Sequence, residues 1–259
     1  MMNMHGLIKF FKHRFHAKNR HGIHSPFVYH LLDSIIYDFG AKAVYQEIEQ
    51  LRNDLLRDKR RKNHTKSASG SDHDMQRSIS VVAKSVLKPA RRSRLLYRLA
   101  ADLKPGTIIE LGASLGITTA YLAKAAPGAR FINIMEFSET LAIAEENLQK
   151  LNIRGVELQS GNTDELLPKF LDGIPELDFI LIDGNHSRVA ILNYFKSCLP
   201  KMSKHSMMVF EDIYQSKEMN SAWTEIKSNP EVSVTIDLFW IGLVFVGRAQ
   251  SKEDFFIRF

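Results

Sequence analysis

The sequence is poor in cysteine, because its 259 residues include only one, Cys198. A single cysteine cannot form an intrachain disulfide, which argues against a small disulfide-stapled secreted scaffold. Cys198 lies in an apolar run and is therefore expected to be a buried side chain, not a reactive thiol. Long hydrophobic runs are also missing, so we expect neither a membrane-spanning helix nor a secretory signal. These absences predict a cytoplasmic protein.

Acidic residues are scarce in the first part of the chain. Residues 1–98 contain 20 Lys and Arg against 8 Asp and Glu, whereas residues 99–259 contain 15 against 21. The net charge of +6 therefore combines +12 in the first part with −6 in the second. Eight of the ten histidines also lie in residues 1–98. We expect a basic helical region over residues 1–98 and a separate domain over residues 99–259.

The basic region has helical patterns and one polar stretch. Helices are predicted over residues 7–15, 25–39, 46–57 and about 79–102, and a mobile loop over the Ser-rich residues 58–75. The favoured interpretation is that these helices dock as a lid on the strand ends or on a second subunit of a homodimer, with their charges solvated. Residues 59–62 and 91–94 leave open a clamp for RNA or an anionic substrate. The amphipathic residues 7–15 leave open contact with a membrane surface.

The acidic part alternates strand-like and helix-like segments. Strands are predicted over residues 107–111, 131–136, 156–159, 177–183 and 207–212, and helices over 118–126, 138–151, 164–171, 188–199 and 218–228. Two further strands, 232–238 and 241–247, are too close together for a crossover helix and should form an antiparallel hairpin. The pattern predicts an α/β fold with a doubly wound, mostly parallel seven-stranded sheet, a C-terminal antiparallel hairpin and a helical N-terminal extension.

The first predicted strand runs into a glycine turn that reads Glu110-Leu-Gly112-Ala-Ser114-Leu-Gly116. Its spacing is not the G-x-G-x-x-G of a pyrophosphate-binding turn. Gly112 and Gly116 would let the backbone approach a cofactor without phosphate, such as a sulfonium amino acid. Glu110 is then placed to hold the ammonium end of that cofactor. The alternative is a turn that only packs a helix against a strand.

Further polar residues follow the predicted strands. Thr118 begins the first helix and is a candidate for the carboxylate end of the cofactor. Glu136 ends the second strand, where a carboxylate can accept hydrogen bonds from both ribose hydroxyls of an adenosine. Asn162, after the third strand, is placed for a contact to the adenine edge, although asparagine there also caps helices. Together these positions predict an adenosine-containing cofactor.

Three carboxylates, Asp183, Glu211 and Asp212, end the fourth and fifth strands. Adjacent parallel strands would bring them together, where they repel one another unless a cation, a proton or a basic neighbour intervenes. Oxygen ligands of this kind suit Mg²⁺ or a similar divalent cation, which would lower the pKa of a substrate hydroxyl. Asp183 and His186 are the candidate catalytic residues, with His186 taking the proton or aligning the substrate.

These motifs resemble class I S-adenosylmethionine (AdoMet)-dependent methyltransferases, in the branch of the catechol and caffeoyl-CoA O-methyltransferases. The resemblance implies cofactor contacts at Glu110, Gly112, Ser114, Gly116, Thr118, Glu136, Asn162 and Asp183, and a metal site at Asp183, Glu211 and Asp212. The chain departs from the branch in two places: the acidic pair is Glu-Asp instead of Asp-Asn, and His186 stands where the branch has a lysine. Residues 21–27 (HGIHSPF) are similar to a bacterial subgroup of the superfamily.

The resemblance implies O-methylation of a small molecule by in-line methyl transfer. Two alternatives stay open. One is a methyltransferase that acts on RNA or protein and uses the basic region as a clamp. The other is a protein that binds AdoMet without catalysis, since a fold alone does not establish an activity.

Overall fold

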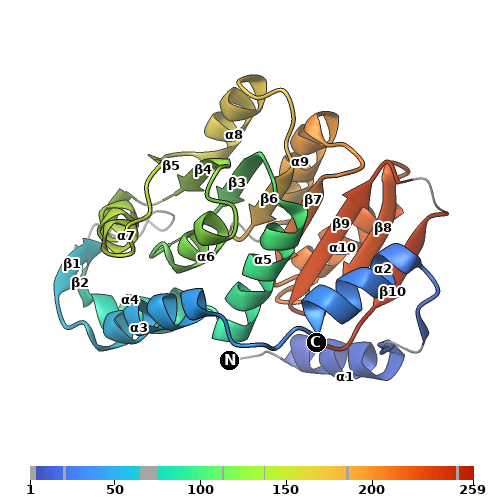
Figure 1. Ribbon diagram of the computed structural model, residues 1–259, viewed down its shortest axis with the longest axis horizontal. Coiled ribbons are helices and arrows are strands. Elements are labelled where there is room, and N and C mark those ends of the chain that lie inside the picture. Colours follow the sequence, from blue (N-terminus) through green and yellow to red (C-terminus); the bar gives the residue numbers. More distant parts are fainter. Residues whose placement is uncertain are drawn as a thin grey trace.

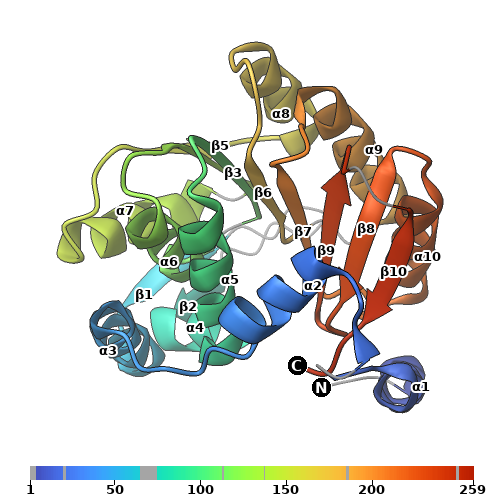
Figure 2. The ribbon, with the colours of Figure 1, turned by 45° about the vertical axis from the view of Figure 1, so that its right-hand side comes forward.

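The computed structural model describes residues 4–19, 22–64, 75–112, 114–136, 138–184, 187–248 and 251–259. Eight strands form one sheet in the order β10-β8-β9-β7-β6-β3-β4-β5 (Figures 1 and 2). From β3 (Thr107–Leu111) the chain passes to β4 (Arg130–Met135) and β5 (Val156–Ser160). It then returns to β6 (Phe179–Ile182) and β7 (Met207–Glu211) on the other side of β3. The strand order thus reverses between β3 and β6, the point where doubly wound sheets bind ligands.

The predicted hairpin is confirmed: β8 (Val232–Asp237) and β9 (Ile241–Val246) pair in antiparallel fashion, and β9 is also antiparallel to β7. The sheet has one strand more than the seven predicted, because β10 (Glu253–Phe256) adds to β8 in parallel. Two exposed acidic residues open β10, so its sequence looks like a polar tail. Its pairing follows from the free edge of β8, which a local pattern does not reveal.

Helices cover both faces of the sheet. On one face, α8 (Thr163–Asp172), α9 (Arg188–Cys198) and α10 (Lys217–Ser228) share a core with strand residues such as Ile109. On the other, α2 (Pro26–His30), the π-helix η2 (Leu31–Ile36) and α5 (Ala90–Leu103) pack on residues such as Ile108. Ile108 and Ile109 face opposite ways because side chains alternate along a strand. The predicted burial of Cys198 is confirmed, since its side chain is fully buried in the first core.

The basic N-terminal region is built into this fold. A third core joins α3 (Ala43–Arg57) and α4 (Ile79–Val86) to α6 (Ile117–Ala125) and α7 (Ser138–Lys150). The boundary expected at residue 98 falls inside α5, whose apolar side chains belong to the core of the sheet. The single helix predicted over residues 79–102 is wrong, because Pro89, which lacks an N–H, separates α4 from α5. That break leaves Lys88 in the connection between the two helices.

The loop predicted over residues 58–75 is wrong at both of its ends. β1 (Arg61–His64) pairs antiparallel with β2 (Met75–Ser78), and residues 65–74 lie outside the described part of the chain. Arg60 ties this hairpin to the domain by donating to both carboxylate oxygens of Glu146 on α7, at 3.0 and 3.1 Å. The polar composition of the segment hides this pairing.

The first helix, α1 (Met4–His16), packs against the end of β8. His13, which is 7% exposed, lies 3.0 Å from both the backbone oxygen and the carboxylate of Asp237. Phe10 makes an edge contact with Phe239, with ring centroids 5.1 Å apart. The opposite side of α1 leaves Phe11 and Phe15 exposed. These contacts fix α1 at the end of β8, on the edge of the sheet where Asp237 lies.

The segment after α1 runs beside the C-terminal strand, so residues far apart in sequence meet (Figure 2). Lys18 donates its backbone N–H to Phe256 at 2.7 Å, and a β-bridge joins Lys18 to Ile257. None of the described helices is both long enough and apolar enough to cross a membrane.

Candidate active site

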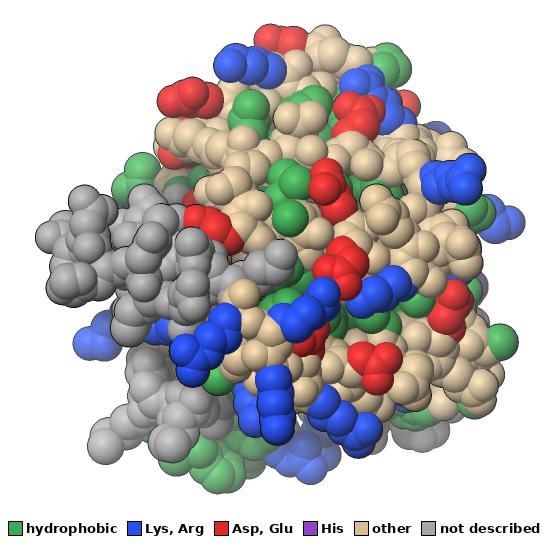
Figure 3. Space-filling view, turned by 90° about the vertical axis from the view of Figure 1, so that its left-hand side faces the viewer, with side chains coloured by type: hydrophobic (Ala, Val, Ile, Leu, Met, Phe, Trp, Pro, Cys, Tyr) green, Lys and Arg blue, Asp and Glu red, His purple; other side chains and the backbone are tan. Residues whose placement is uncertain are grey.

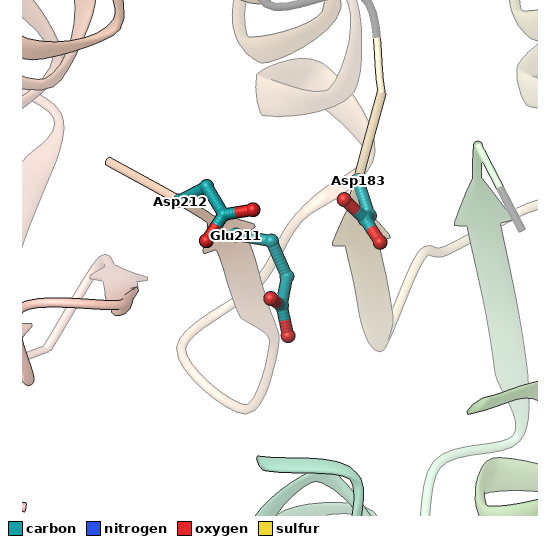
Figure 4. A group of neighbouring side chains, drawn as sticks. All are labelled: Asp183, Glu211 and Asp212. Atoms are coloured by element: carbon teal, nitrogen blue, oxygen red, sulfur yellow. The ribbon is translucent and has the colours of Figure 1, made fainter. Parts of the chain in front are cut away.

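Three carboxylates meet at the carboxyl ends of β6 and β7 (Figure 4). Asp183 directly follows β6, Glu211 is the last residue of β7, and Asp212 follows it. Because β6 and β7 are parallel neighbours, with Ile182 opposite Phe210, these ends lie side by side. One oxygen from each carboxylate lies within 4.8 Å of the others. The predicted convergence of Asp183, Glu211 and Asp212, hereafter the acid triad, is thus confirmed.

Two cations from the N-terminal region contact the acid triad. The ammonium Nζ of Lys88 lies 3.0 Å from Asp183, 3.8 Å from Glu211 and 2.6 Å from Asp212. Arg92, on the first turn of α5, lies 3.4 Å from Glu211 and 2.8 Å from Asp212. Sequence reasoning did not single out Lys88, and it placed Arg92 only in the possible clamp of residues 91–94. The available signal was Pro89, which ends the preceding helix and frees Lys88 to face the strand ends.

Arg92 is also held by an aromatic side chain. Its guanidinium lies over the indole of Trp240, 4.3 Å from the ring centroid, in the geometry of a cation–π contact. The backbone oxygen of Trp240 accepts from the N–H of Asp212 at 2.6 Å. Asp212 itself has a φ of +54°, a conformation that non-glycine residues rarely adopt. Trp240 therefore fixes both Arg92 and the turn that aims Asp212 at it.

Burial and charge act against each other in this cluster. Burial alone would lower the pKa of Lys88, but the attraction of the three carboxylates outweighs it and raises that pKa above the usual range. Burial would raise the pKa of Asp212, but Lys88 and Arg92 outweigh it and lower that pKa. Glu211 is only 2% exposed, and burial followed by repulsion from Asp183 raises its pKa. A proton on Glu211 would leave two carboxylates facing two cations.

This arrangement bears on the predicted metal site. A divalent ion held by the acid triad would need oxygens from these side chains directed at it. Here one ammonium lies within 3.8 Å of an oxygen of each member of the triad. The donor set does not fit a resident divalent ion while Lys88 and Arg92 balance it. The sequence left open whether a cation, a proton or a basic neighbour relieves the repulsion among the three carboxylates. In the structure, basic neighbours do so, namely Lys88 and Arg92.

The turn after β3 lies against the same site. Gly112 has a φ of +84°, and a Cβ there would lie 1.3 Å from the backbone oxygen of Asp183. The N–H of Asp183 donates to the oxygen of Leu111 at 2.9 Å. Gly112 is therefore required for the close approach of two loops at the switch point. This approach places the glycine turn beside the acid triad.

The comparisons with known proteins identify the segment that carries this geometry. Residues 109–213 match a family model described as a methyltransferase domain. The match begins in β3 and ends just after Asp212, so it includes the glycine turn and the acid triad.

Curated relatives and solved structures show further likeness. The chain is similar to the transmembrane O-methyltransferase homolog of Rattus norvegicus, with 32% identity over 81 residues, which are 30% of this chain and 31% of the rat protein. The chain thus matches less than a third of that relative's length. The SAH-bound methyltransferase PaMTH1 of Podospora anserina has a TM-score of 0.60 at 12% identity and covers 82% of this chain and 91% of its own. The SAM complex of the O-methyltransferase TomG of Streptomyces achromogenes has a TM-score of 0.58 at 16% identity, covering 82% and 93%.

Glu110, near the end of β3, lies in a closed hydrogen-bond network inside the matched segment. It is 1% exposed, and its Oε2 accepts from Thr119 Oγ1 and Asn133 Nδ2, both at 2.7 Å. Asn133 also donates to Thr119 at 2.9 Å. Burial raises the pKa of Glu110 to about 7, although these hydrogen bonds lower it. The threonine that donates to Glu110 is Thr119, and the cofactor contact expected of the neighbouring Thr118 stays a prediction.

The other predicted cofactor residues surround the same strand ends. Gly116 is the N-cap residue of α6 and has a φ of +77°. A Cβ at this position would lie 3.2 Å from Ala144 of α7, which is a tight contact. Asn162 caps α8, accepting from the N–H of Asp164 at 2.9 Å, as the alternative interpretation expected. Ser114 and Thr118 are half-buried and Glu136 is exposed. Cofactor contacts at these residues stay predictions, and His186 lies outside the described residues.

Proposed function

We propose that the chain is an AdoMet-dependent methyltransferase that methylates an oxygen of a small molecule. The observation that carries the proposal is the position of the acid triad, which lies beside the Gly112 turn at the switch point of a methyltransferase domain. The solved O-methyltransferases with this fold, such as the TomG complex with SAM, support both the cofactor and the type of acceptor.

The chemistry of the strand ends suits this cofactor. AdoMet supplies a methyl group on a positively charged sulfur, which an acceptor oxygen attacks in line. The glycine turn from Gly112 to Gly116 offers backbone instead of bulky side chains, as a methionine tail requires. The exposed carboxylate of Glu136, directly after β4, is free to accept from ribose hydroxyls. Asp183 belongs to the acid triad and also contacts the glycine turn, so it can help to orient the cofactor and the acceptor.

A small-molecule acceptor is favoured over RNA by the contacts of the arginines once considered as a clamp. Arg91 lies over the ring of Phe259 at 4.2 Å, and Arg94 over Tyr45 at 5.2 Å. Arg92 is paired with Asp212. Figure 3 shows lysine and arginine side chains gathered on the lower part of one face, with acidic side chains among them, not a stripe of one sign. The homodimer and the cytoplasmic location stay predictions.

The test is AdoMet binding by calorimetry on the full-length protein. Glu136→Ala should weaken binding about tenfold or more, since it removes the acceptor for the ribose hydroxyls. The matched control is Glu145→Ala, which removes an exposed carboxylate from α7, away from the strand ends. Unchanged affinity in Glu136→Ala would refute the ribose contact. No AdoMet binding by the wild type would favour the non-catalytic alternative.

A further inference from the structure

Lys88 is held at both ends, as a residue with a fixed position would be. Its backbone oxygen accepts from the guanidinium of Arg52 at 3.1 Å. Its ammonium contacts all three members of the acid triad, and its side chain is 20% exposed. Pro89 directly follows Lys88 and is the N-cap residue of α5. Its ring restricts the backbone and so fixes the direction of the chain after Lys88. The ammonium is therefore directed at the strand ends by the fold of the N-terminal region.

Arg92 completes the balance of charge. It contacts Glu211 and Asp212 from the side of Trp240, with 11% of its side chain exposed. Removing one partner from a buried group of charges leaves the others uncompensated, which is costly. A divalent ion at the triad would also meet the ammonium of Lys88 at close range, where two positive charges repel strongly in a partly buried site. Either Lys88 or a divalent ion can occupy this position, but not both.

We propose that Lys88, supported by Arg92, is the resident cation of this site, and that the methyltransferase works without a divalent metal. The inference rests on the proposed function for its meaning in catalysis, but the charge arrangement can be tested by itself. Lys88 supplies at the strand ends the positive charge that a metal ion would otherwise supply. A lysine from the N-terminal region then links that region to the chemistry of the domain.

The test measures Mn²⁺ binding to the full-length protein after treatment with a chelator, by electron paramagnetic resonance of the free ion and by the shift in Tm. The wild type should leave the Mn²⁺ signal and its own Tm unchanged. Lys88→Met leaves the triad short of one positive charge, so it should bind Mn²⁺ about tenfold or more tightly than the wild type. The control is Lys84→Met, which removes an exposed lysine from α4, four residues before Lys88.

Stoichiometric Mn²⁺ binding by the wild type would overturn the proposal, because a metal would then displace Lys88. Equal Mn²⁺ binding by Lys88→Met and Lys84→Met would also overturn it. If Lys88→Met does not fold, Mn²⁺ binding is measured instead on Lys88→Arg and the wild type. Neither protein should bind Mn²⁺, and binding by either one contradicts the proposal. AdoMet calorimetry with chelator present separates this from the proposed function. Loss of AdoMet binding would reject the function, while the Mn²⁺ comparison would still decide the role of Lys88.

Discussion

Gly112→Ala should open the junction between β3 and β6. A Cβ at residue 112 would lie 1.3 Å from the backbone oxygen and 2.4 Å from the backbone carbon of Asp183. The overlap involves backbone on both sides, so no side-chain rotation can relieve it. The two loops would have to separate, and the hydrogen bond from Asp183 N–H to Leu111, 2.9 Å long, would break.

The magnitude follows from these separate losses. Alanine at the φ of +84° found at Gly112 costs about 1–2 kcal/mol in backbone conformation. The broken hydrogen bond adds about 1 kcal/mol, and displacement of packed backbone brings the total to about 3–5 kcal/mol. For a chain of this length, each kcal/mol lowers Tm by about 2–4 °C. The variant should therefore unfold about 6–20 °C below the wild type.

Two controls divide this loss into its parts in a thermal unfolding assay. Gly155 has a φ of +82° but no atom within 4 Å of a built Cβ, so Gly155→Ala reports the backbone conformation alone. Gly128 has neither a positive φ nor a near neighbour, so Gly128→Ala should stay within about 0.5 kcal/mol of the wild type. If Gly112→Ala loses no more stability than Gly155→Ala, the close approach to Asp183 carries no cost and the reasoning fails.

Two further predictions concern buried polar groups. Since the pKa of Glu110 is raised from 4.5 to about 7, its contribution to stability is full below pH 4.5 and is lost as the pH rises through 7, about 3 kcal/mol in all. Glu110→Gln mimics the protonated form and should remove this loss in urea unfolding at pH 5 and pH 8; an unchanged pH dependence would contradict the assignment. His13→Ala should cost about 1–3 kcal/mol and speed amide exchange in α1, because it removes the buried contact that ties this helix to Asp237. His16→Ala, which loses only a bond to its own helix, is the control, and equal losses would argue against docking through His13.

The sheet was predictable where strands carry apolar runs. The segment that contains β6 is apolar at nearly every position because both faces of a central parallel strand are covered. The convergence of Asp183 with Glu211 and Asp212 followed from the same reasoning, since neighbouring parallel strands end at one edge. β10 was not predictable, because its two leading acidic residues conceal a strand that only the edge of β8 selects.

The partners of the site residues depend on geometry that sequence patterns do not fix. Lys88 pairs with residues more than 90 positions away, and no periodicity connects them. The helix predicted from residue 118 begins at Ile117, and a shift of one residue turns a helical side chain by about 100°. Thr119, which donates to Glu110, therefore points in another direction from α6 than Thr118 does. Errors of one residue matter little for a fold and decide the chemistry of a site.

The bridge between Lys18 and Ile257 has a consequence for how the protein is made. Synthesis is vectorial, so the residues of α1 leave the ribosome before those of β8 and β10 and must wait for them before they can dock. Until then, Phe10 and His13 lack the surfaces that bury them in the finished protein. The apolar side of α1 thus stays uncovered while the residues between α1 and β10 are made, and it is available to chaperones that act on nascent chains.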